Sequence, residues 1–186
     1  LVGRGVAADH ADTAATSSGG RPGIALLLGM RPEVAAFRSS WLGVPGRLTS
    51  DAGVAFRLAS ELVAAVDPLM GALVERQETE QAATDAAGVA ARRLKERHER
   101  ERKRAASALH VAGLEILASW YRDAAAAQHG APIRNRDVSG ADLADVSARD
   151  AVARAHRVLE CIEFLEANQR PELAFAALFS DLAARR

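Results

Sequence analysis

The chain has 186 residues with 24 basic and 24 acidic side chains, and 49% of it is hydrophobic while only 4% is aromatic. The balanced charge disfavours tight, autonomous binding to nucleic acid or to an anionic membrane. The single cysteine, Cys161, excludes an intramolecular disulfide framework and a cysteine-based zinc cluster. No apolar run reaches the roughly 18 to 20 residues of a membrane helix, so we expect a cytoplasmic, alanine-rich, all-α protein.

The sequence pattern of residues 1–30 predicts a short helical hairpin. A first helix is expected from about Gly5 to Ser18, and two glycines close it. Pro22 suits the first turn of a second short helix, because its missing N–H is not needed there. Since the chain begins at Leu1 inside an alanine-rich helical pattern, we interpret it as a segment of a longer protein.

Two further helical stretches follow the hairpin. A helix is expected from about Pro32 to Leu42, and the stretch from Gly43 to Gly46 is expected to be a turn. Ser50 is the expected N-cap of a long amphipathic helix, which Pro68 kinks. The predicted apolar stripe of this helix comprises Phe56, Leu58, Leu62, Val63, Val66, Leu69, Met70, Leu73 and Val74.

Residues 76–104 form a charged segment, and Leu94 is the only apolar side chain between Arg92 and Arg104. Alternating charge predicts a solvated helix held by i to i+4 ion pairs, with a mobile loop at 84–88. Interleaved glutamates cancel much of the attraction to phosphates, and no aromatic side chain is present to stack on bases. The arginines that remain weak candidates for phosphate contacts are Arg97, Arg100 and Arg104.

The sequence after residue 108 predicts three more helical stretches and no β pattern. Helical periodicity resumes at Leu109 and ends near His129, while Ser139 and Ser147 are expected N-caps. Pro171 is expected to start the last helix. The helix after Ser147 is predicted to bury Val152, Ala155, Leu159, Ile162 and Leu165. The fold class is therefore all-α, a bundle of about five helices preceded by the hairpin.

Catalytic chemistry finds little support in the residue pattern. The five histidines are scattered, and no nucleophile-elbow, phosphate-loop or dinucleotide-binding motif occurs, so we expect no catalytic, cofactor or metal site. Carboxylates at 160, 163 and 166 predict an exposed helix face, and Cys161 is expected to be a small buried hydrophobe. Core packing is expected for Trp41, Trp120 and Tyr121.

Two stretches resemble the delta-prime subunits of the bacterial DNA polymerase III clamp loader. Residues 18–26 resemble the Ser-x-Gly-x-x-Gly-x-Ala-Leu turn and helix that close the AAA+ lid of this family. Residues 117–186 carry the second part of the resemblance, and the charged helix near 95–104 is similar to actinobacterial versions. The motifs of that second stretch are Trp120-Tyr121-Arg122-Asp123, His129-Gly130-Ala131, Asn135-x-Asp137 and Asn168-Gln169-Arg170-Pro171-Glu172-Leu173.

The resemblance implies a place in a five-subunit ring that loads the sliding clamp onto primed DNA. Residues 1–30 would be the end of the AAA+ lid and residues 31–186 the helical collar domain, a non-catalytic part of a DNA-directed DNA polymerase holoenzyme. The implied partners are the delta and ATPase subunits, with no membrane, small-molecule substrate, metal or cofactor. Gly23 occupies the position where ATP-binding relatives place a sensor arginine.

The candidate subunit interface lies in the last two helices, at Phe164, Phe175 and Phe179, some of which belong to the core. A charge at Phe175 is expected to weaken assembly without unfolding the domain. Two alternatives stay open: the lid and collar of an ATP-hydrolysing clamp loader subunit, and an autonomous nucleic-acid-binding helical domain that acts through the arginines of the charged segment.

Overall fold

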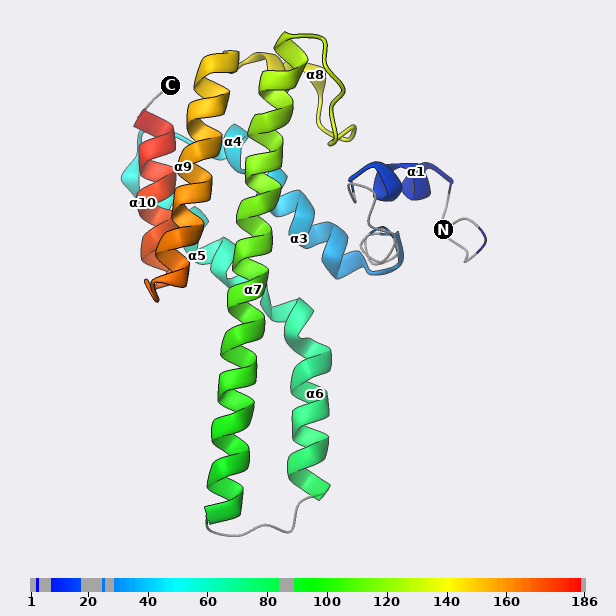
Figure 1. Ribbon diagram of the computed structural model, residues 1–186, viewed down its shortest axis with the longest axis vertical. Helices are drawn as coiled ribbons and strands as arrows, with labels where there is room; N and C mark the ends of the chain where they lie inside the picture. The colour runs from blue at the N-terminus through cyan, green and yellow to red at the C-terminus, as the bar shows by residue number, and fades with distance from the viewer. Residues whose placement is uncertain (1–2, 4–7, 18–24, 26–28, 84–88, 185–186) are drawn as a thin grey trace.

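The computed structural model describes residues 3, 8–17, 25, 29–83 and 89–184, and within these ranges the regular structure is helical, without strands. This confirms the all-α prediction. Figure 1 shows a body from which α6 and the N-terminal half of α7 project together as an arm. The elements are α1 (Ala8–Ser17), α3 (Pro32–Leu42), α4 (Val44–Arg47), α5 (Ala52–Ala64), α6 (Asp67–Ala83), α7 (Val89–Gln128), α8 (Gly140–Ala144), α9 (Ala148–Glu166) and α10 (Pro171–Ala184).

The expected hairpin of residues 1–30 is described only in part. Helix α1 lies within the predicted first helix, whereas Pro22 and Gly23 lie outside the described residues. Helix α3 has the predicted bounds. The prediction of a simple turn from Gly43 to Gly46 is wrong. This stretch enters the one-turn helix α4, whose first turn accommodates Pro45.

The core gathers the aromatic side chains of three helices, α3, α7 and α10. Trp41 and Tyr121 are fully buried and Trp120 nearly so, which confirms their predicted core positions. The Trp41 ring lies directly on Gly113 of α7, where any Cβ atom would collide with the indole. Helices α3 and α7 therefore approach each other closely only because residue 113 has no side chain.

The long helix predicted after Ser50 is two helices. Asp51, rather than Ser50, is the N-cap of α5, and its Oδ1 accepts a hydrogen bond of 2.7 Å from the Gly53 N–H. Helix α5 ends at Ala64, and Pro68 lies in the first turn of α6, where its lack of an N–H costs no hydrogen bond. Phe56, predicted to be buried, is 49% exposed.

The arm is an antiparallel pair formed by α6 and the N-terminal half of α7. Helix α7 as a whole is one continuous helix of 40 residues. Its ion pairs run mostly between the two helices, Arg76 to Glu101 and Glu80 to Arg97. Only the pair of Arg92 and Glu96 among those described has the predicted i to i+4 form in the arm. The expected mobile loop at 84–88 lies outside the described residues.

Two polar side chains are buried within this arm. The Gln77 amide donates to the Glu101 carboxylate at 2.9 Å, and His98 Nε2 lies 2.9 Å from the Glu80 carboxylate. Residues 76–104 are therefore not solvated on all sides, because α6 covers one face of α7.

Helix α9 is rotated about its axis relative to the prediction. Ser147 caps it as expected, its Oγ accepting from the Asp150 N–H at 3.1 Å, and Ser139 caps α8 in the same way. Val152 and Leu159 are about half exposed instead of buried. The buried residues are Ala151, Arg154, Val158, Cys161 and Leu165. Both patterns fit helical periodicity, and packing against α7 and α10 selects the second.

The motifs that carry the family resemblance form turns and a buried polar network. Gly130 ends α7 and Asn168 follows α9, each with φ of 63°, the left-handed conformation that glycine and asparagine adopt most readily. Asp123 is fully buried and holds the loop after α7 through Asn135, which in turn accepts a hydrogen bond from Arg38 of α3. These motif residues therefore fix the architecture of the body.

Candidate assembly surface

The three candidate interface phenylalanines separate into one surface residue and two core residues. Phe164 of α9 is 50% exposed, whereas Phe175 and Phe179 of α10 are fully buried. Phe175 packs edge-to-face on Trp41, with ring centroids 5.2 Å apart, and on His110 at 5.6 Å. An interface role for Phe175 and Phe179 is therefore wrong in this fold, because their rings fill the core. Phe164 keeps the predicted surface position.

Phe164 lines a shallow groove of about 300 Å³ between α9 and α10. Nearly buried apolar side chains line it, Cys161 from α9 and Ala174 and Leu178 from α10. Arg157 borders the groove with ion pairs to Glu160 at 2.7 Å and to Asp181 of α10 at 2.9 Å. The groove therefore combines an apolar surface with a polar border, as helix-binding surfaces do.

Three further large apolar side chains are about half exposed on the same two helices. They are Val152 and Leu159 of α9 and Leu173 of α10. Sequence reasoning missed all three as surface residues, because Val152 and Leu159 also match a buried stripe and Leu173 sits beside buried positions. Together with Phe164, these three residues place most of the exposed large hydrophobic side chains of the described residues on α9 and α10.

Cys161 is a structural side chain rather than a nucleophile. It is 2% exposed, which confirms the predicted burial, and burial raises the pKa of its thiol to about 11. Only about one thiol in ten thousand is then ionised at pH 7, and the thiolate is the reactive form. We expect maleimide labelling of Cys161 at pH 7 to be at least ~100-fold slower in the native protein than in urea, measured by mass spectrometry. Equal labelling rates would contradict this burial.

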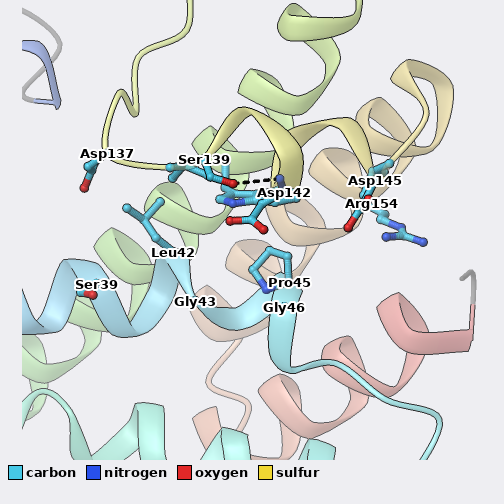
Figure 2. A pocket seen from close by; sticks show the side chains of 13 residues that line it. Ser39, Leu42, Gly43, Pro45, Gly46, Asp137, Ser139, Asp142, Asp145 and Arg154 are labelled. Carbon is cyan, nitrogen blue, oxygen red and sulfur yellow. Dashed lines mark hydrogen bonds between the residues drawn. The ribbon is translucent and has the colours of Figure 1, made fainter.

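A second cavity of about 380 Å³ lies between the α3–α4 corner, α8 and α9 (Figure 2). Asp137, Asp142 and Asp145 line it from the segment around α8. Asp137 pairs with Arg38, and the Ser139 hydroxyl caps α8, the hydrogen bond drawn in Figure 2. The Asp137 and Ser139 side chains therefore serve the fold.

The candidate phosphate contacts Arg97, Arg100 and Arg104 are exposed on α7. Arg97 pairs with Glu80, whose pKa is lowered mainly by its hydrogen bond from this arginine. The sensor position Gly23 lies outside the described residues. In the described ranges, no group of His, Cys, Asp and Glu side chains is placed to hold a metal ion.

No described helix combines the length and apolarity that a membrane crossing requires. Comparison of the chain with protein-family models, with curated proteins and with solved structures gave no match. The groove and its exposed phenylalanine are therefore interpreted from their own geometry and from the sequence motifs.

Proposed function

We propose that this chain is a non-catalytic assembly module, the C-terminal collar domain of a delta-prime subunit of the DNA polymerase III clamp loader. The observation that carries the proposal is the half-exposed Phe164 at an apolar groove between α9 and α10. An apolar groove edged by an exposed phenylalanine is the kind of surface to which an amphipathic helix binds. The sequence motifs of residues 117–186 supply the identity of the partners, the delta and ATPase subunits.

The helical body suits a collar for physical reasons. Aligned helices present rigid faces, and a neighbouring helix can enter the α9–α10 groove and cover Phe164 with a small loss of side-chain entropy. A standard interface buries on the order of 1,600 Å² in total, so α9 and α10 would supply only its centre. Contacts from the other helices would complete the surface.

Binding to the loader subunits tests this function directly. Residues 1–186 are mixed with purified delta and ATPase subunits of the same organism, and complex formation is followed by size-exclusion chromatography and calorimetry. We expect a complex that contains the chain. A chain that elutes alone in the presence of every loader subunit would exclude the proposal.

The exposed phenylalanine gives a sharper prediction. Phe164→Glu is expected to weaken complex formation by about 30-fold or more, because a charge replaces an apolar anchor of about 2 kcal/mol. Phe56→Glu is the matched control, since Phe56 is 49% exposed but belongs to α5, outside the groove. Both variants should keep the wild-type circular dichroism spectrum. Equal weakening by the two substitutions would argue against the groove as the contact.

A further inference from the structure

The arm carries a row of exposed arginines along one side of α7. Residues 93, 97, 100 and 104 are separated by four, three and four positions, which places them within about 60° of one another around the helix. At 1.5 Å per residue the row is about 16 Å long. We call these four residues the arginine row: Arg93, Arg97, Arg100 and Arg104.

Two of the three glutamates that alternate with these arginines are directed away from the row. Glu101 is turned toward α6, where it accepts from Gln77 at 2.9 Å and pairs with Arg76. Glu96 accepts from Arg92 at 3.0 Å, and helix geometry places Glu99 about 130° away from the row. Glu96 stays beside the row, three positions after Arg93 and four before Arg100, whereas Glu99 and Glu101 are directed away from it.

The arginines themselves are mostly available. Glu80 of α6 pairs with Arg97, whose side chain is still 56% exposed. Arg93, Arg100 and Arg104 are exposed, and no ion pair of the described residues involves them. The stretch from Val89 to Arg104 contains eight basic and three acidic side chains, so the N-terminal part of α7 concentrates positive charge, whereas α6 carries four acidic side chains and one basic side chain.

We propose that the arginine row binds the phosphate backbone of double-stranded nucleic acid. Planar guanidinium groups match phosphate oxygens in charge and hydrogen-bond geometry. Residues 67–104 contain no Phe, Trp or Tyr, so the arm lacks the stacking platforms that single strands require. Leu94 is partly buried, and the arm has no apolar face of the kind that inserts into a lipid interface.

The row is separate from the groove between α9 and α10. It projects from the body on the arm, as Figure 1 shows, so binding of a duplex there is compatible with binding of a protein partner at the groove. Failure of one proposal therefore leaves the other intact.

The salt dependence of duplex binding tests this inference. Residues 1–186 are titrated against a fluorescent duplex of about 20 bp, and anisotropy is measured between about 50 and 200 mM KCl. Four phosphate contacts predict a slope of log K against log salt near −3.6, which is a loss of about 150-fold in affinity over this range. Arg100→Gln with Arg104→Gln should halve the slope and reduce the loss to about 12-fold.

Matched variants separate the row from net charge. Lys95→Gln with Arg102→Gln removes the same charge from exposed positions on the opposite side of α7, and the slope should stay near −3.6. Arg100→Lys with Arg104→Lys keeps the charge and should keep the slope. An equal fall in slope with the Lys95 and Arg102 variant would overturn the proposal. It would also be overturned by tighter binding to a single strand of the same length, or to phosphatidylserine vesicles.

Discussion

Phe175→Glu is expected to unfold the domain rather than detach it from a partner. The Phe175 ring is fully buried between Trp41, His110 and Phe179. Losing a buried phenylalanine side chain costs about 3 to 5 kcal/mol, and a carboxylate in its place must either be buried or take up a proton. The total stability of a domain is only about 5 to 15 kcal/mol. Circular dichroism in urea measures the loss.

A graded series at Phe175 distinguishes volume from charge. Phe175→Leu should lower the free energy of unfolding by about 1 to 2 kcal/mol and Phe175→Ala by about 3 to 5, with the glutamate variant below both. A glutamate variant that keeps the wild-type urea midpoint would contradict the burial of Phe175 and would indicate that this residue lies on the surface. Our sequence expectation, weakened assembly without unfolding, would then hold.

The difference between expectation and structure at this position has a physical cause. Helix α10 is apolar on much of its circumference, and Phe175, Phe179 and Leu173 are equally hydrophobic in sequence. Periodicity alone does not say which side meets α5 and α9. The answer depends on residues such as Trp41, more than a hundred positions away, whose ring occupies the space beside Phe175.

Helix positions and caps were more predictable than helix faces. Local signals located α3, the N-caps Ser139 and Ser147, and the break near Pro68, because each depends on a few neighbouring residues. The prediction of the buried face of α9 was wrong, because Ala151 and Arg154 are buried in place of Val152 and Leu159. A buried arginine contradicts the usual hydrophobicity ranking, so no sequence pattern favours it.

The arm shows the same division between local and distant interactions. Its charge and helicity follow from the sequence, but the burial of His98 and Gln77 requires α6 to pack beside α7. That packing also selects which glutamates face the other helix. Helical spacing in the sequence already groups Arg97, Arg100 and Arg104, but only the structure shows that Glu101 faces α6 and that Arg97 pairs with Glu80.

Asp123→Ala is expected to be among the most destabilising substitutions outside the aromatic core. One carboxylate oxygen accepts from the backbone N–H groups of Arg134 at 2.9 Å and Asn135 at 2.6 Å, and from the Asn135 side-chain amide at 2.8 Å. Arg122 donates to the other oxygen at 2.7 Å. Alanine would leave the two Asn135 donors, which are buried, and the part-buried Arg134 N–H without their acceptor, at a cost of about 3 to 5 kcal/mol.

The same substitution should also loosen the connection between α3 and the loop after α7. Asn135 accepts at 2.7 Å from Arg38 of α3, and Arg38 donates to Asp137 at 2.9 Å, so Asp123 positions one of the two acceptors of Arg38. Thermal unfolding should show a melting temperature lower by about 10 °C. Asp137→Ala should lower it less, because the Asp137 side chain is 34% exposed and Arg38 keeps Asn135. Equal falls in melting temperature would mean that the network stabilises the fold no more than a surface ion pair does. A larger fall for Asp123→Ala would mean that the buried carboxylate of Asp123 contributes most of the stability of the network.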